Sequence, residues 1–288
     1  MPTEPPSIPS RTLEPGLYIV ATPIGNLGDM TLRAIETLKT VDMIYAEDTR
    51  HSKPLLQHFN IQNQLHPLHE HNEAQQVDHI IEQLQQGKKI ALISDAGTPL
   101  ISDPGMPLVQ KAKQNNIRVE PIPGACAAIA ALSVSGLASD KFLFAGFIPA
   151  KHQARLQFLQ NYLHQDAVTI FYESPHRIID CLSDMMAVYG KERLLVYARE
   201  LTKQFETVKL AALSDIYEFV IADDNQQKGE IVLILDKAAP QNTDDKEALR
   251  ILKILSNEMS VSQACKLAAK LTNMKKNQLY QLALAHNL

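Results

Sequence analysis

The chain has few cysteines, no long apolar run and little excess charge, and each shortage excludes a class of protein. Its three cysteines, Cys126, Cys181 and Cys265, are far apart and show no C-x-x-C spacing, which argues against a disulfide framework and a structural zinc site. No apolar run reaches the roughly eighteen residues of a membrane span, and the start MPTEPPSIPS lacks the features of a secretion signal. We expect a cytoplasmic protein with reduced cysteines, no metal and no membrane contact.

Basic residues are also too few for a protein that binds nucleic acid non-specifically over its whole surface. The net charge is -4, whereas phosphate binding requires lysine and arginine. The charge is unevenly distributed, because Met259 to Leu288 contains four lysines and no acidic residue. A basic end on an acidic body suggests that this end meets a polyanion.

Short apolar runs such as GLYIVAT, KKIALIS and GEIVLIL alternate with helical patterns along most of the chain. Runs that are almost continuously apolar are typical of strands covered on both faces, so the pattern predicts an α/β fold with mostly parallel sheets. Breaks near Ser135–Lys141 and Lys237–Lys246 predict four segments. These are a disordered tail over 1–14, α/β domains over 15–135 and 136–238, and a helical, helix-turn-helix-like unit over 239–288.

Two loops follow the first two predicted strands. In ATPIGNLGD, Gly25 and Gly28 precede a helix, but their spacing matches neither the dinucleotide pattern nor a phosphate loop, so we do not expect nicotinamide or nucleoside triphosphate binding. In YAEDTRHS, charged residues gather where open α/β sheets bind ligands. The alternatives are an ordinary strand-to-helix turn and a surface salt-bridge cluster.

Two further loops are rich in small residues. SDAGTPLISDPG, beginning at Ser94, and PIPGACAAIAAL, beginning at Pro121, each follow an apolar run. Gly97 leaves the backbone of the first accessible, and small side chains open the helix after the second. An Ala-rich helix packed closely on a sheet would explain the second loop alone. Together, the two loops predict a slot for a flat or bulky ligand.

Other polar clusters are less specific. FYESPHRI and ARELTKQFE place charged residues after strands of the second unit, where salt-bridged helix starts are the alternative. His66, His69 and His71 could suggest a metal, but no cysteine accompanies them and we favour an exposed connection.

Taken in order, the motifs TPIGNLGD, AEDTRHS, SDAGTPLISDPG, PGACAAIAAL, FYESPHR and ARELTKQFE resemble the tetrapyrrole methylase superfamily. They are most similar to its members that methylate the ribose 2'-hydroxyl of a cytidine in the decoding region of small-subunit (16S) rRNA. The resemblance runs from about Leu17 to the end of the chain. It implies two α/β domains with S-adenosylmethionine in the cleft between them, a C-terminal helix-turn-helix and a homodimer.

The resemblance also implies roles for individual residues. The cofactor would contact Asp95, Gly97, Thr98, Gly124, Cys126 and Ala127 from the first domain, and Tyr172, Gly229 and Glu230 from the second. The substrate would meet Pro23, Gly25, Asn26, Gly28 and Asp29 in the first loop. Apart from the resemblance, a ribose hydroxyl must lose its proton, and the candidate bases are Glu47, Asp48, His51 and Glu173, with Arg50, Arg177 and Arg199 placed to hold phosphates. The basic tail would meet the substrate through Lys266, Lys270, Lys275 and Lys276.

Two alternatives stay open. The superfamily also contains methyltransferases that act on tetrapyrroles or other small molecules, although such a substrate should not need the basic tail. The chain could instead be a non-catalytic RNA-binding protein, which would not bind S-adenosylmethionine. Because the acidic body is unsuited to naked RNA, we expect the substrate to be an assembled small ribosomal subunit.

Overall fold

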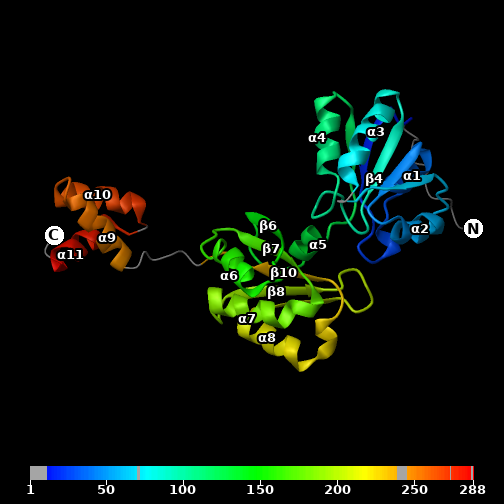
Figure 1. Ribbon diagram of the computed structural model, residues 1–288. Helices are drawn as coiled ribbons and strands as arrows, with labels where there is room; N and C mark the ends of the chain where they lie inside the picture. The colour runs from blue at the N-terminus through cyan, green and yellow to red at the C-terminus, as the bar shows by residue number, and fades with distance from the viewer. Residues whose placement is uncertain (1–11, 70–71, 239–244, 273, 287) are drawn as a thin grey trace, which may run out of the picture.

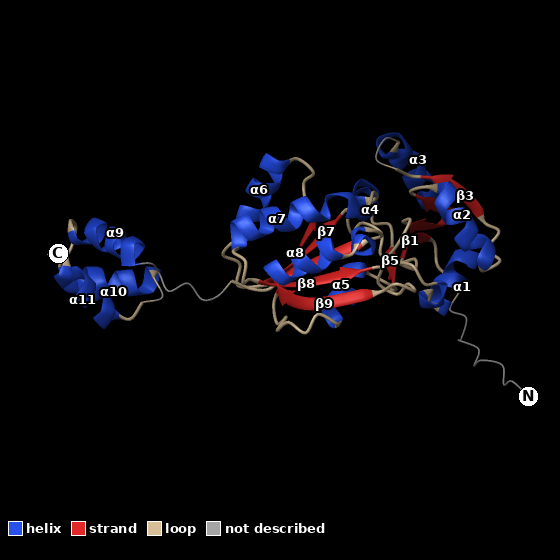
Figure 2. Cartoon of the chain, turned by 90° about the horizontal axis from the view of Figure 1, so that it is seen from below, coloured by secondary structure: helices blue, strands red, loops and turns tan. Residues whose placement is uncertain are grey.

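The computed structural model describes residues 12–69, 72–238, 245–272, 274–286 and 288. Two five-stranded sheets make up the body, and three further helices form a separate group (Figures 1 and 2). Most of the predicted disordered tail over 1–14, and the linker over 239–244, lie outside the described residues. No helix in the described part of the chain is long and apolar enough to cross a membrane.

The first sheet is parallel throughout, as the sequence predicts. Its strand order is β3-β2-β4-β1-β5, and its helices α1 and α2 pack on one face while α3 and α4 pack on the other. The carboxyl ends of all five strands therefore meet at one edge of the sheet. The elements are β1 (Gly16–Val20), 3-10 helix η1 (Leu27–Asp29), α1 (Leu32–Thr40), β2 (Met43–Ala46), α2 (Thr49–His58), β3 (Gln64–Pro67), α3 (Glu73–Gln85), β4 (Lys89–Ile93), α4 (Met106–Gln114) and β5 (Val119–Ile122).

The second sheet differs from the prediction of mostly parallel strands. Its order is β6-β7-β10-β8-β9, and only β6 and β7 are parallel. Strand β10, the last strand among the described residues, lies between β7 and β8, a long-range pairing that local sequence patterns do not encode. The elements are β6 (Phe142–Phe147), α6 (His152–Gln160), β7 (Val168–Glu173), η2 (Pro175–Arg177), α7 (Ile178–Tyr189), β8 (Leu194–Arg199), β9 (Thr207–Ala212), α8 (Leu213–Ala222), η3 (Asp224–Gln227) and β10 (Ile231–Leu235).

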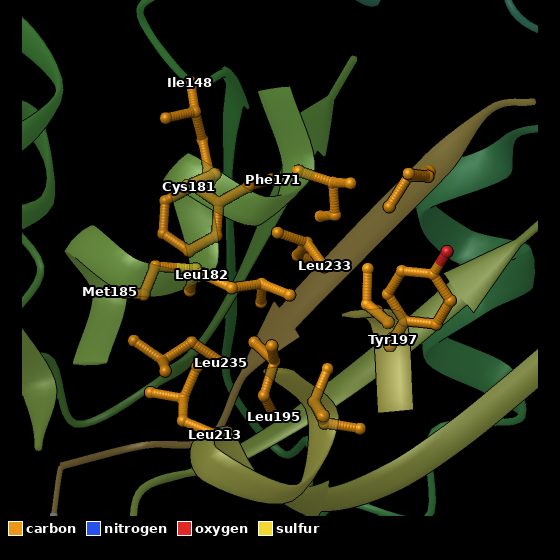
Figure 3. Close-up of a cluster of buried hydrophobic side chains, with 14 of the residues drawn as sticks. Ile148, Phe171, Cys181, Leu182, Met185, Leu195, Tyr197, Leu213, Leu233 and Leu235 are labelled. Atoms are coloured by element: carbon orange, nitrogen blue, oxygen red, sulfur yellow. The ribbon is translucent and has the colours of Figure 1, made fainter. Parts of the chain in front are cut away.

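Helices cover the second sheet unequally. On one face, α6, α7 and α8 bury a large core that includes Phe171 and Tyr197 (Figure 3). On the other face lies the short helix α5 (Ala127–Ser133), whose Ala128 and Ala131 are buried against β7, β8 and β10. The predicted segment 15–135 includes α5 with the first domain, yet this helix packs on the second sheet.

The C-terminal unit consists of α9 (Asp245–Ser256), α10 (Val261–Leu271) and α11 (Lys276–Ala285), as the sequence predicts. Its small core is built from Ala248, Leu252, Ala264, Cys265, Ala268, Leu279 and Ala283.

Candidate functional site

The loops after β1, β4 and β5 are tied into one wall. Thr22 and Gly97 exchange two backbone hydrogen bonds of 2.8 and 3.1 Å, and Thr98 Oγ1 donates to the carbonyl of Ala125 at 3.0 Å. Gly97 has φ +82°, and a β-carbon there would lie 3.3 Å from Ile24 Cγ2. A side chain at this position would therefore be strained and crowded, which explains the glycine.

This wall faces the second domain across a cavity of about 520 Å³, which we call the interdomain cavity. The predicted cofactor residues Asp95, Gly97, Thr98, Cys126, Ala127, Tyr172, Gly229 and Glu230 all line it. The remaining lining residues are Ile24, Glu47, Ala96, Ile101, Ser102, Asp103, Phe147, Glu173, Ser174, Pro175, Ile231 and Val232.

Gly124, also predicted to contact the cofactor, is not among the lining residues. A β-carbon on Gly124 would lie 2.8 Å from the β-carbon of Ala21. Its glycine is therefore explained by the close approach of two strand-end loops, a packing role that the motif alone did not reveal.

The interdomain cavity combines acidic and apolar walls. Its described lining contains five carboxylates, on Glu47, Asp95, Asp103, Glu173 and Glu230, and no lysine, arginine or histidine. The rest of the lining is largely apolar or aromatic and includes Tyr172 and Phe147, whose rings lie 5.4 Å apart. S-adenosylmethionine fits this lining, because its sulfonium and ammonium groups suit carboxylates and its adenine suits the apolar wall.

The SDAGTPLISDPG loop contributes two aspartates to the interdomain cavity, and the charge of one affects the pKa of the other. Asp95 Oδ1 accepts the backbone N–H of Asp48 at 3.0 Å, which ties this loop to the loop after β2. Burial, together with the charge of Asp95, raises the pKa of Asp103 to about 6, against the opposing effect of a hydrogen bond with Ser94. Asp103 was not predicted as a site residue, although it lies in a quoted motif.

A second cavity of about 570 Å³, which we call the outer cleft, lies beside the first. The two share Ile24, Asp95, Ala96 and Glu230. Of the residues predicted to meet the substrate, Pro23 and Gly25 line the outer cleft, whereas Asn26, Gly28 and Asp29 do not. These three belong to the η1 turn, which Asn26 caps by accepting the N–H of Gly28 at 2.9 Å.

The outer cleft also includes His58 and Lys203, which were not predicted as site residues. Lys203 comes from the second domain, where its ammonium lies 2.7 Å from Glu200 Oε1 and 3.2 Å from Glu230 Oε2. A β-carbon on Gly25 would lie 2.5 Å from Lys203 Cγ. Glycine is therefore favoured here, both by its φ of +147° and because a side chain would displace Lys203.

The structure separates the four candidate bases. Hydrogen bonds from Arg50 lower the pKa of Asp48 to about 2, so this carboxylate is a poor proton acceptor. Glu173 is buried, and its Oε1 already accepts the backbone N–H of Ser174 at 2.6 Å and the Arg177 guanidinium at 2.7 Å. Glu47 lines the interdomain cavity. Of the four, only His51 lines the outer cleft.

The predicted phosphate ligands are also separated. Arg199 is buried and donates to Gln226 Oε1 and to the carbonyls of Lys228 and Phe205, which does not fit a phosphate contact. Arg177 is occupied by Glu173. Arg50 is exposed at the outer cleft. The four lysines Lys266, Lys270, Lys275 and Lys276 are exposed on α10 and at the start of α11.

The histidine cluster does not form a metal site within the described residues, where no group of three or more metal-type ligands gathers. His66 instead lies half-buried on β3, with its ring 5.3 Å from that of Tyr45, so the expectation of an exposed connection is wrong for this residue. His71 lies outside the described residues.

Comparisons with known proteins agree with this architecture. The family model for Tetrapyrrole (Corrin/Porphyrin) Methylases matches residues 16–217, and that for the RsmI C-terminal HTH domain matches 242–287. The chain is 50% identical over 273 residues to a Ribosomal RNA small subunit methyltransferase I from Haemophilus influenzae, covering 94% of this chain and 96% of that one. It is 50% identical over 269 residues to the protein of the same name from Escherichia coli O157:H7, with 93% and 94% covered.

Solved structures show the same fold at low sequence identity. Uroporphyrin-III-C-methyltransferase from Thermus thermophilus matches with a TM-score of 0.55 at 18% identity, covering 77% of this chain and 94% of that one. A diphthine synthase matches with a TM-score of 0.59 at 16% identity, covering 77% and 90%.

Proposed function

Because the chain belongs to the tetrapyrrole (corrin/porphyrin) methylase family, and within it to the ribosomal RNA small subunit methyltransferase I group, we propose that it methylates the ribose 2'-hydroxyl of a cytidine in the decoding region of 16S rRNA. The methyl donor is S-adenosylmethionine. The observation that carries the proposal is the pair of adjoining cavities: a carboxylate-lined cavity beside a cleft that presents Arg50, His51 and Lys203.

The cofactor, when bound, supplies an electrophilic methyl group attached to a cationic sulfur. The residues of the interdomain cavity would hold it, with the carboxylates of Asp95 and Asp103 facing its positive charge. The shared rim, which includes Ile24 and Ala96, would limit the direction from which a hydroxyl can approach. Alignment of the reacting atoms at roughly 3 Å is the main source of acceleration in such a displacement.

His51 would accept the proton of the ribose hydroxyl. It lines the outer cleft on α2, whereas the other three candidates are paired, buried or on the cofactor side. A positioned general base contributes roughly 10²- to 10⁴-fold to a rate. Arg50 and Lys203, on opposite sides of the cleft, would hold the nucleotide that presents the hydroxyl.

The substrate is the assembled small ribosomal subunit, which this protein would modify in the cytoplasm. The exposed lysines of α10 and α11 would approach the particle, while the acidic body disfavours naked RNA.

The test is transfer of labelled methyl to subunits from a strain that lacks this gene, compared with protein-free rRNA. We expect label in the particles; equal labelling of free rRNA would contradict this choice of substrate. Cofactor binding without transfer to either would favour a tetrapyrrole or another small molecule.

Cofactor affinity should depend on pH through Asp103. The pKa of Asp103 is raised to about 6 in the folded protein, so folding favours its protonated form. The contribution of Asp103 to the free energy of unfolding is therefore greatest below its unfolded pKa and is lost as pH rises through about 6. A cationic ligand favours the ionised form of Asp103, so the affinity for the cofactor should increase as pH rises through about 6. We expect calorimetry to show weaker cofactor binding at pH 5.5 than at pH 7.5, and Asp103→Asn to flatten this change. An equally steep profile in the variant would remove Asp103 from the account.

A homodimer is also proposed, through the face of the second sheet that carries α5. Leu210 and Val208 on β9 pair with Val196 and Ala198, which are buried beneath α5. Directly opposed residues on neighbouring strands project to the same face of a sheet. Leu210 and Val208 therefore lie on the same face as α5, but the helix does not cover them and both are exposed.

Leu210→Glu should convert the dimer to a monomer in light scattering coupled to gel filtration. The matched control is Ile221→Glu on α8, which has the same exposure of 41% but lies on the helix that covers the other face. Dissociation by both variants, or by neither, would reject this interface.

A further inference from the structure

Helix α2 separates the outer cleft from a third cavity, of about 580 Å³, on its other side. We call this third cavity the α2–β3 groove; it lies between α2, the turn after it and the start of β3. Leu56 and Ile61 are buried in it, while Lys53, Gln57 and Gln62 are lining residues of polar character. Arg50 lines both the groove and the outer cleft, so the two cavities adjoin at this side chain.

The charge of the three cavities changes in one direction. The interdomain cavity is lined by five carboxylates and, among the described residues, no cationic side chain. The outer cleft combines two carboxylates, Asp95 and Glu230, with Arg50 and Lys203. The described lining of the α2–β3 groove has Arg50 and Lys53 and no carboxylate. From the interdomain cavity through the outer cleft to the α2–β3 groove, the lining therefore changes from acidic, which suits a cation, to basic, which suits an anion.

The sequence around the groove extends this pattern. Between Thr49 and His69 the chain contains no Asp or Glu, although acidic residues exceed basic ones overall. Helix α2 itself therefore has no carboxylate that would repel a phosphate backbone, and the carboxylate at its N-cap, Asp48, is paired with Arg50. Gln57 and Gln62 carry amides that can donate to phosphate and sugar oxygens and accept from ribose hydroxyls.

We propose that the α2–β3 groove binds the sugar–phosphate backbone of the rRNA strand next to the target nucleotide. This inference rests on the proposed function, since it extends the substrate path from the outer cleft over α2. Lys53 contacts a phosphate, and the amides of Gln57 and Gln62 contact the backbone beside it. Such contacts do not read sequence; they fix the register of the strand, and so decide which ribose enters the outer cleft.

The test compares Lys53→Gln with Lys39→Gln in methyl transfer to small subunits. Lys39 is an exposed lysine on α1 of the same domain and is not a lining residue of the groove or the outer cleft. Lys53→Gln should raise KM by about 3- to 10-fold, leave kcat and cofactor affinity unchanged, and reduce the slope of log affinity against log salt by roughly one. Lys39→Gln should match the wild type. Equal behaviour of the two variants, or a fall in kcat at unchanged KM, would overturn the inference.

A second measurement identifies what occupies the groove. A photocrosslinking amino acid at Gln57 should crosslink to nucleotides adjoining the methylated one; a crosslink to a ribosomal protein alone would reject RNA as the occupant. Wild-type transfer is measured first with the same subunits. If the proposed function fails, wild-type transfer is absent, whereas failure of this inference leaves wild-type transfer intact.

Discussion

Asp95→Ala should weaken S-adenosylmethionine binding by about 100-fold, the effect of losing a charge-assisted contact together with its anchoring role. Asp95 lies on the rim shared by the interdomain cavity and the outer cleft. Its Oδ1 also accepts the N–H of Asp48, so the variant both removes a negative charge and releases the loop after β2. Isothermal calorimetry of the purified protein measures this directly.

Asp95→Asn separates these two contributions. The asparagine oxygen can still accept the N–H of Asp48, so the loop should stay in place while the charge is lost. We expect about a tenfold loss of cofactor affinity for Asp95→Asn, and no change for the control Asp166→Asn, which alters an exposed carboxylate paired with Lys141. An Asp95→Ala protein that binds the cofactor within twofold of the wild type would contradict the assignment.

Arg155→Ala should lower the free energy of unfolding by about 3 kcal/mol, as expected when one partner of a buried ion pair is removed. The Arg155 side chain is only 4% exposed, and its Nε lies 2.6 Å from Asp184 Oδ2. It also donates to the carbonyl of Ala150 at 3.2 Å. Without Arg155, the Asp184 carboxylate would remain in a mostly dry site with His152 at 3.0 Å.

Urea unfolding followed by circular dichroism tests this prediction. Lys141→Ala is the control, because it breaks an ion pair between exposed side chains and should not measurably change the unfolding midpoint. A double variant, Arg155→Met with Asp184→Leu, should recover much of the lost stability since it leaves no unpaired charge. Equal destabilisation by Arg155→Ala and Lys141→Ala would show that burial of the Arg155 pair is irrelevant to stability.

The arrangement of the first domain could be predicted well because its signals are local. Strands β1, β2 and β4 are almost continuous apolar runs followed by loops of small or charged residues, and parallel pairing brings these loops to one edge. The edge strand β3, with the sequence QLHP, has no such run and was not predicted. Glycines such as Gly97 then mark where the backbone must adopt a positive φ. Eight of the nine residues predicted to contact the cofactor line the interdomain cavity.

The second domain was harder to predict because its decisive contacts are distant in sequence. Insertion of β10 between β7 and β8 makes most of this sheet antiparallel, and no local pattern encodes that choice. Arg199 carries the charge expected of a phosphate ligand, but its burial among carbonyl groups depends on neighbours 6 to 29 residues away. Lys203 lines the outer cleft through a contact with Gly25 of the first loop, 178 residues away in the sequence.

The site of the transferred methyl group tests the central claim most directly. Small subunits from a strain that lacks this gene would be labelled with the purified protein and S-adenosylmethionine, and their rRNA hydrolysed with alkali. A 2'-O-methyl group blocks cleavage at its own nucleotide, so we predict that the label remains in one dinucleotide that begins with a cytidine of the decoding region. Label released in a mononucleotide, which would place the methyl group on a base, or label outside the decoding region, would contradict the account.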